Sequence, residues 1–489
     1  MKDIIVRVQS LEIEGFKSIS KGTLVLDSES NLSSRAGFMH GNLKGIYGQN
    51  GSGKTSIIEI FKLLKNIWSG LKIHEYADLL SGENQKTKLK ATFFILDEGL
   101  EKKTITKVVY TVELQAIQMS SGEKEVHIAS ESLESSSKDL NLENSKFGLK
   151  NSFKFTRSSE SEAEFTVAPK KLKSIPGSKS LNRLQIGASM DAEHSSLFSK
   201  NGYKLLMKTS PELDNEESEQ ASTSENKERY KQLISSIEII RRFSERYLRI
   251  IENKQISDGG SSQFFHLSVL TDQGGSRLIS KTPSFEGLTI EEEYFIRIAP
   301  AFKQIDLILN ALVPSVHFVF KDEKYTKPDG IQEVKIKFFT LRDGKFIPLE
   351  NESEGIRRLV SVISEICTMF NERDYFLLID EFDSGVFEYL LGELLEVIEE
   401  NGKGQFLFTA HNLRPFEVLK PKNIILATAD KLNRFVPMQK IQKNNNMRDV
   451  YYRMLALNDS DVLLYEKTQT GKIRNALFKA GKLMSESRE

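Results

Sequence analysis

The sequence predicts an α/β fold with a mostly parallel core sheet, an antiparallel β subdomain and a largely helical insertion. Two features predict the core sheet. A glycine-rich loop lies between a short apolar strand and an amphipathic helix, and two later apolar strands end in polar residues. Alternating apolar and polar residues in the first 130 positions predict the antiparallel part.

The glycine-rich loop, residues 48–55, fits the pattern G-x-x-x-x-G-K-[ST]. Residues 43–47 before it predict a strand, and residues 56–64 after it predict a helix. Backbone N–H groups of such a loop cradle phosphates at the helix N-terminus, Lys54 reaches the β- and γ-phosphates, and Thr55 offers a hydroxyl to Mg²⁺. The residues predicted to hold the nucleotide are Gly48, Asn50, Gly51, Ser52, Gly53, Lys54, Thr55 and Ser56.

Composition limits the partners and the compartment. Lys+Arg and Asp+Glu both number 68 in 489 residues, so any contact with nucleic acid needs a local basic patch. The single cysteine, Cys367, excludes an internal disulfide and a thiolate metal site, and its apolar neighbours predict a core position. No stretch has the shape of a signal peptide or of a membrane span, so we expect a cytoplasmic protein without membrane contact.

Four segments are expected along the chain. Residues 1–134 form an N-terminal lobe with the glycine-rich loop and a β meander, and residues 135–330 form an insertion. Residues 331–436 form a C-terminal lobe, and residues 437–489 form a helical tail. Within the insertion, the Ser/Glu-rich stretch 211–226 predicts mobility, and apolar stripes predict helices over 228–251 and 290–312.

A continuous apolar run, residues 375–379, ends in Asp380 and Glu381, as in a strand buried on both faces of a parallel sheet. Ligands of open α/β sheets bind at the carboxyl ends of the strands, so Asp380 is expected beside the phosphate loop, where it holds Mg²⁺ through water. Glu381 is expected to act as the general base for the attacking water.

A second buried strand, residues 405–410, ends in His411. Of the seven histidines, only this one follows such a strand, at the place where a sensor of the γ-phosphate is needed. The alternative is a structural histidine, which is the more common role of a lone one.

The segment 352–358 precedes the helix that contains Cys367. Ser353 can serve as its N-cap and Gly355 allows close backbone approach, so this helix start can face a phosphate. The alternative is a capped helix start without a ligand.

In this order the motifs resemble the ATP-binding-cassette (ABC) ATPases of the RecF/SMC type, a group that includes soluble AAA-family ATPases. Residues 11–19 resemble the family's opening strand and residues 48–55 its Walker A motif. Ser353-Glu354-Gly355 is similar to the signature, Asp380-Glu381 to Walker B, Asp383-Ser384-Gly385 to the D-loop, and His411 to the switch histidine. The resemblance covers the two ends of the chain and says little about residues 135–330.

The resemblance implies that ATP and Mg²⁺ are bound and that ATP is hydrolysed. It also implies a nucleotide-dependent head-to-tail dimer or higher homo-oligomer, in which Ser353 and Gly355 of one copy touch the γ-phosphate held by the other. The signature departs from the usual leucine-serine-glycine-glycine form, because Glu354 replaces a glycine. Gln185 is a candidate for the family's glutamine loop, although no motif assigns the region around it.

The tail, from Asn446 through Gly481, is similar to the endings of standalone bacterial ATPases of this type, several of which act in anti-phage defence beside a separate effector. A plain helical cap on the ATPase is equally compatible. The first functional hypothesis is therefore an ATP-dependent assembly switch that controls an effector protein.

The alternative is a RecF-like DNA-binding ATPase in DNA repair or chromosome maintenance. Its best basic patch comprises Lys170, Lys171, Lys173, Lys179 and Arg183, and such a run is also compatible with a solvated face. A transporter subunit is disfavoured, because a very large insertion separates the P-loop from the signature.

Overall fold

The core is a six-stranded sheet with the order β19-β18-β3-β17-β16-β9. Its strands are β3 (Asn42–Tyr47), β9 (Leu248–Ile251), β16 (Phe376–Ile379), β17 (Gln405–Thr409), β18 (Ile424–Ala427) and β19 (Phe435–Pro437). All pair in parallel except β19, which lies antiparallel to β18 at one edge. The expected strands before the glycine-rich loop, before Asp380 and before His411 are confirmed as β3, β16 and β17.

The computed structural model describes residues 4–81, 86–99, 103–120, 122–142, 145–159, 162–172, 182–183, 185–187, 191–208, 224–252, 265, 267–270, 276–278, 283–438, 446–457 and 469–486. The stretch 211–223, most of the expected mobile segment, lies outside these residues. So do Lys173 and Lys179 of the predicted basic patch.

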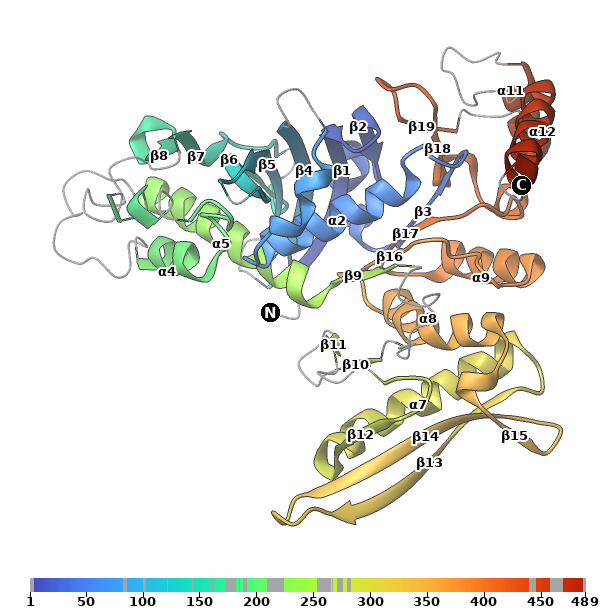
Figure 1. Cartoon of the computed structure of the whole chain (residues 1–489). Helices are drawn as coiled ribbons and strands as arrows, with labels where there is room; N and C mark the ends of the chain where they lie inside the picture. Colours follow the sequence, from blue (N-terminus) through green and yellow to red (C-terminus); the bar gives the residue numbers. More distant parts are fainter. Residues whose placement is uncertain are drawn as a thin grey trace.

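Helix α2 (Lys54–Trp68) follows the glycine-rich loop and lies between two sheets (Figure 1). On one side, the ring of Phe61 meets Phe376 of the core sheet edge-on, with 5.4 Å between centroids. Near the other end of the helix, Trp68 packs against Phe93 of the antiparallel sheet, at 5.0 Å. Large aromatic contacts of this kind fix the helix, and therefore the loop before it, relative to both sheets.

The antiparallel sheet has seven strands in the order β2-β1-β4-β5-β6-β7-β8. They are β1 (Ile4–Phe16), β2 (Ile19–Val25), β4 (Lys86–Asp97), β5 (Thr104–Gln118), β6 (Lys124–Asp139), β7 (Asn151–Ser159) and β8 (Glu162–Ala168). The expected antiparallel meander is confirmed in β4, β5 and β6. The sheet continues past residue 134, so residues between 135 and 330 contribute strands as well as helices.

Two helices, α4 (Lys200–Lys208) and α5 (Ser224–Arg246), accompany this sheet (Figure 1). The predicted helix over 228–251 is wrong at its end, because α5 stops at Arg246 and residues 248–251 form β9. This strand pairs in parallel with β16, and Leu248 and Ile251 are buried in the core. Ile251 fits the helical stripe of the preceding residues as well as a strand, because so short a stretch is compatible with either period.

A third sheet and a long helix form an arm (Figure 1). Its elements are β12 (Leu288–Glu291), α7 (Glu292–Leu312), β13 (His317–Thr326), β14 (Gln332–Arg342) and β15 (Lys345–Pro348). A small pair, β10 (Ser268–Leu270) and β11 (Ser276–Leu278), lies nearby. The expected helix over 290–312 is confirmed as α7, and the expected hairpin at 342–345 joins β14 to β15.

Helix α8 (Glu354–Asn371) connects the arm to the core. Its first turns, including Leu359 and Ile363, pack in the apolar cluster of the arm with Phe302 and Phe338. Its later turns, including Ile366, belong to the core cluster that contains α2 and the central strands. A rigid helix shared by two cores transmits any displacement of one to the other.

The described part of the chain has five further helices. They are α1 (Glu29–Leu32), α9 (Glu388–Asn401), α10 (Pro415–Val418), α11 (Met447–Leu457) and α12 (Thr470–Glu486). Short 3-10 turns occur at Arg35–Phe38, His74–Leu79, Lys170–Leu172, Leu349–Asn351 and Pro421–Asn423. Cys367 is half-buried, so the expected core position needs correction: it lies on the less covered side of α8. Among the described residues, no helix is long and apolar enough to cross a membrane.

Candidate functional site

The sequence motifs meet at one edge of the core sheet, because the parallel strands β3, β16 and β17 end there together. Backbone hydrogen bonds continue just past the strands and join the loops: the N–H of Phe382 donates to the carbonyl of Thr409 at 2.9 Å, and that of Ala410 to Ile46 at 3.3 Å. Segments more than 300 residues apart in sequence therefore form one site.

The phosphate loop has the backbone shape that its glycines permit. Gly51 and Gly53 have φ angles of 80° and 92°, which residues with a side chain rarely adopt. No atom lies within 4 Å of a Cβ added at Gly51, so this position requires glycine for its conformation and faces open space. Asn50 and Thr55 are exposed, and Ser56 is buried in the first turn of α2.

The side chain of Lys54 folds back over its own loop. Its Nζ donates to the carbonyls of Gly48 and Gln49, at 2.7 and 3.0 Å. Burial lowers the pKa of Lys54, and the nearby carboxylates of Asp380, Glu381 and Asp383 oppose that shift. The loop carbonyls thus hold the Lys54 ammonium group near the three carboxylates. When a nucleotide binds, the same ammonium group can bond phosphate oxygens in place of these carbonyls.

Two observations test whether a nucleotide with Mg²⁺ fits these residues. The hydroxyl of Ser52 is buried and has no hydrogen-bond partner among the described residues, so a polar atom is left for a ligand. The hydroxyl of Thr55 lies near the carboxylate of Asp380 and lowers its pKa, so the two predicted metal-binding groups are neighbours. The site therefore fits ATP with Mg²⁺, through Thr55 and Asp380.

Asp380 is buried, with 5% of its surface exposed, and Thr409 supports it. The Thr409 hydroxyl donates to Oδ1 of Asp380 at 2.6 Å. Burial raises the pKa of Asp380, while the hydrogen bonds from Thr409 and Thr55 and the charge of Arg358 oppose the rise. A bound divalent cation favours the ionised form in the same direction.

Glu381 follows in a strained conformation, with a φ of 46°. Its N–H donates to the Thr409 hydroxyl at 2.8 Å, and its carbonyl accepts from Nη2 of Arg358 at 3.1 Å. The same Nη2 also donates to the carbonyl of Asp380 at 2.7 Å. Thr409 and Arg358 therefore hold the backbone of the carboxylate pair from two sides.

Sequence reasoning missed Thr409 and Arg358 as functional residues. Thr409 lies in the strand of residues 405–410, two positions before His411, and Arg358 lies one turn into the helix that begins at the signature. Arg358 is 1% exposed, and burial lowers its pKa to about 10. Arg358 is recognisable as a buried cation beside two carboxylates only once it is known that helix α8 faces strand β16.

The signature segment presents its polar start to solvent. Ser353 and Glu354 are exposed, and the Ser353 hydroxyl caps α8 by accepting from the N–H of Ile356 at 3.4 Å. Ser353 N–H in turn donates to the buried Glu352 carboxylate at 3.1 Å. The helix N-terminus and a hydroxyl thus face outward together.

Gly355 and the D-loop touch directly. A Cβ on Gly355 would lie 2.3 Å from the carbonyl oxygen of Gly385, so no larger residue fits there. The D-loop carboxylate of Asp383 accepts from the N–H groups of His411 and Asn412, at 2.9 and 2.7 Å. The signature, the D-loop and the His411 loop are therefore linked in series, and the His411 side chain is exposed at the end of this series.

Gln185, the weak candidate for the glutamine loop, is described but belongs to no strand of the core sheet. The structure instead brings the end of β9 beside Asp380, whose N–H donates to the carbonyl of Ile251 at 2.9 Å. The segment that leaves the site on this side begins at Glu252. The next glutamine in the sequence, Gln255, lies outside the described residues.

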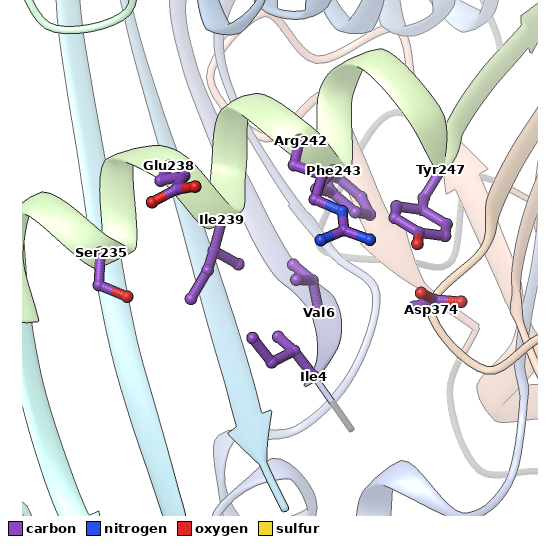
Figure 2. A pocket seen from close by; sticks show the side chains of 9 residues that line it. All are labelled: Ile4, Val6, Ser235, Glu238, Ile239, Arg242, Phe243, Tyr247 and Asp374. Carbon is purple, nitrogen blue, oxygen red and sulfur yellow. The ribbon is translucent and has the colours of Figure 1, made fainter. Parts of the chain in front are cut away.

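Two hollows in the described part of the chain lie away from these motifs. The first, of about 80 Å³, lies between α5 and the start of β1; it is lined by Ile4, Val6, Ser235, Glu238, Ile239, Arg242, Phe243, Tyr247 and Asp374 (Figure 2). The second, of about 770 Å³, lies at the amino ends of β3 and β17, near Asn42 and Gly404. Neither contains a residue of the motifs. Within the described ranges, no group of three or more His, Cys, Asp or Glu side chains is arranged to hold a metal.

Comparison with known proteins gives one family match. Residues 7–432 match the model of the RecF/RecN/SMC N terminal domain. No curated protein matches the chain.

Among solved structures, the SMC head domain from Thermotoga maritima is 13% identical, with a TM-score of 0.34 and coverage of 89% of this chain and 100% of that one. The Smc head domain with a coiled coil and joint from Pyrococcus yayanosii is 12% identical, with a TM-score of 0.40 and coverage of 92% and 99%. A SmcHead bound to the C-winged helix domain of ScpA is 14% identical, with a TM-score of 0.38 and coverage of 88% and 96%.

Replacing Thr409 with valine is expected to lower kcat for ATP hydrolysis by about 10-fold or more and to change KM less than about 3-fold. The substitution keeps the shape but removes the donor to Asp380 and the acceptor for the Glu381 N–H, leaving buried polar groups unpaired. Steady-state ATPase assays measure both constants.

Thr409→Ser is expected to restore most of kcat, because serine keeps the hydroxyl. Thr87→Val is the matched control, since Thr87 is also buried in a strand and bonds the carbonyl of Gly15, away from the site. Equal losses of kcat in Thr409→Val and Thr87→Val would contradict the positioning role of Thr409.

The environment of Asp374 predicts that the free energy of unfolding depends on pH. Burial raises its pKa to about 6; Glu372 adds to the rise, whereas Arg7 and Arg242 oppose it. The folded state thus binds this proton more tightly than the unfolded state does, so its contribution to stability is lost as pH rises from about 4 to about 6.

Asparagine at position 374 has no proton to release in this range, so the Asp374→Asn protein does not lose this stability as the pH rises. The free energy of unfolding of Asp374→Asn relative to the unsubstituted protein is therefore expected to increase between pH 4.5 and pH 7, by at most about 3 kcal/mol. Urea unfolding at both pH values measures this difference. A difference that is the same at both pH values would show that Asp374 does not titrate in this range.

Proposed function

The chain belongs to the RecF/RecN/SMC N-terminal domain family of ABC-type ATPases, and from that premise we propose that it binds and hydrolyses ATP as a nucleotide-dependent assembly switch. In this proposal, closure of a pair of copies controls a partner effector, in bacterial anti-phage defence, in the cytoplasm. Family membership supports the ATPase activity, and the geometry of this chain supports the assignment of roles to its residues.

The observation that carries the ATPase proposal is the convergence around Lys54. The lysine of the phosphate loop lies within electrostatic reach of Asp380, Glu381 and Asp383, and the hydroxyl of Thr55 lies near the Asp380 carboxylate and lowers its pKa. A phosphate-binding cation, two groups suited to Mg²⁺ and a carboxylate for water activation are the components that phosphoryl transfer to water requires.

Each residue has a distinct role in this proposal. The loop amides and Lys54 bind and orient the phosphates, and Glu381 accepts the proton of the attacking water. Thr55 and Asp380 hold Mg²⁺, which when bound neutralises charge on the β- and γ-phosphate oxygens. Thr409 and Arg358 fix the backbone of Asp380 and Glu381, so that the base is positioned before the substrate arrives.

The exposed signature supports assembly in trans. Ser353 and the α8 N-terminus face solvent while Gly355 is locked against the D-loop, so a phosphate held by a second copy can meet this surface. Glu354 adds a negative charge beside the phosphate, which weakens this contact relative to a glycine. Two such contacts, related by two-fold symmetry, give a closed head-to-tail pair.

In this proposal, the tail carries the effect of the nucleotide from the site to the effector protein. The family match ends at residue 432, so α11 and α12 lie beyond it. Helix α11 is attached next to the His411 loop: Arg448 pairs with Glu417 at 3.0 Å, and the ring of Tyr451 packs on Phe416 at 4.8 Å. Phe416 in turn contacts Tyr47, the residue before the phosphate loop, at 4.7 Å. Changes at the nucleotide therefore reach the tail through packed rings, which supports a switch that acts on an effector.

The RecF-like clamp on DNA is the alternative, and no described contact favours it. Two of the five residues of its basic patch, Lys173 and Lys179, lie outside the described residues. DNA held across the pair would require local positive charge and give an affinity that falls steeply with salt.

Glu381→Gln is expected to bind ATP within about 3-fold of the unsubstituted affinity but to hydrolyse it about 100-fold or more slowly, because it keeps the shape and removes the base. Nucleotide binding by fluorescence titration and phosphate release measure the two effects. Lys54→Ala is the control that loses binding itself. Normal turnover in Glu381→Gln would show that another group activates the water.

Ser353→Arg is expected to abolish the ATP-dependent increase in solution mass of the Glu381→Gln protein, because a bulky side chain blocks the trans contact. Ser353→Ala is the matched control: it removes the same helix cap, at a cost of about 1 kcal/mol, without adding bulk. Mass photometry with and without Mg-ATP measures assembly. Unchanged assembly in Ser353→Arg would rule out contact through the signature.

A further inference from the structure

Helix α12 is exposed along its described side chains. Every residue from 469 to 480 is exposed, including Leu477 at 70% and Phe478 at 69%. Ile473 and Leu477 lie one turn apart and form an apolar stripe with Ala480. An isolated helix of 17 residues is marginal in water, so an exposed stripe of this kind indicates a surface that covers it.

The stripe has basic borders. On the helix surface, Arg474 lies on one side of Ile473 and Leu477, and Lys472 and Lys479 lie on the other. The whole helix contains four Lys or Arg residues and one Glu. The surface that covers α12 is therefore expected to be acidic with apolar positions.

Helix α9 presents such a surface on the same chain. Its sequence contains five glutamates and no lysine or arginine. Glu393, Glu396 and Glu400 are exposed on one face, together with Tyr389 at 52% and Val397 at 50%. Phe387, 68% exposed, packs on Tyr389 at 5.7 Å and extends this face to the end of the D-loop.

We propose that α12 of one copy docks on the exposed face of α9 of a second copy. The apolar stripe covers Tyr389 and Val397, and the basic borders of α12 meet Glu393, Glu396 and Glu400. We identify α12 of a second copy as the helix that covers α9 because the two surfaces are complementary in charge and in their apolar positions. Because each copy carries both surfaces, the exchange is reciprocal and closes as a two-fold pair.

The occupant is a second copy and not the same chain, because the α12 side chains remain exposed in the single chain although Figure 1 shows α12 at the same end of the molecule as α9. Helix α11, by contrast, is fixed to its own chain through Tyr451, which is 7% exposed. The tail is therefore anchored at α11 and available beyond it. This docking uses neither the phosphate loop nor the signature, so it does not depend on nucleotide.

The test is a charge exchange in the full chain without nucleotide. The basic variant replaces Glu393, Glu396 and Glu400 with lysine, and the acidic variant replaces Lys472, Arg474 and Lys479 with glutamate. Sedimentation equilibrium of the unsubstituted protein is expected to show a dimer that weakens with salt. Each variant alone is expected to dimerise at least about 10-fold more weakly, and an equal mixture of the two is expected to regain a salt-sensitive dimer.

The control variant replaces Lys303, Lys335 and Lys337 with glutamate. These exposed lysines of the arm give a similar change of charge away from both helices, and dimerisation is expected to be unaffected. The second test of the apolar stripe is Ile473→Ser with Leu477→Ser, which is expected to weaken the dimer at all salt concentrations.

Three outcomes would overturn the proposal. They are a monomeric unsubstituted protein without nucleotide at tens of micromolar, a mixture of the two variants that stays monomeric, and a monomer that sediments with anionic phosphatidylserine vesicles through α12, which would assign the helix to a membrane surface. The nucleotide-dependent assembly of Glu381→Gln is measured in a separate experiment. Failure of the α12 docking and failure of the nucleotide-dependent pair can therefore be told apart.

Discussion

The parallel pairing of β3, β17 and β16 is the constraint on which the site depends. It places the phosphate loop, the carboxylate pair and the His411 loop at one edge, although the phosphate loop lies more than 300 residues before the other two in the sequence. The hydroxyl of Thr409 then joins two of these strands, because it donates to Asp380 and accepts from the N–H of Glu381. A register slip of one residue would point this side chain away from both partners.

The same edge connects the site to the rest of the chain. Arg358 ties the signature helix to the backbone of Asp380 and Glu381, and Asp383 ties the D-loop to the His411 loop. Phe416 continues this path to Tyr451 in the tail. Groups joined by buried hydrogen bonds and aromatic contacts move together. Binding or loss of a ligand at one of these positions therefore displaces the others.

Much of the core could be predicted from the sequence, since local patterns determine it. The glycine-rich loop, β16 before Asp380 and β17 before His411 each carry their own signal of apolar run and polar end. The strand over residues 248–251 could not be predicted, because three apolar residues in four positions after a helix fit either another turn or a strand, and only pairing with β16 decides between them. The roles of Thr409 and Arg358 depend likewise on tertiary neighbours. The roles of Ser353 and His411 stay predictions, because they concern a second copy and a bound phosphate.

The central claim is that one active site is built from the phosphate loop of one copy and the signature of another. Mixing Lys54→Ala with Ser353→Arg tests it most directly, because each variant alone lacks one half of every site. In an equal mixture, half of the encounters between copies bring the two variants together, and each such pair has one intact composite site. The account predicts ATP hydrolysis by the mixture at about one quarter of the unsubstituted rate, well above either variant alone. A mixture no more active than the mean of the two variants would contradict it.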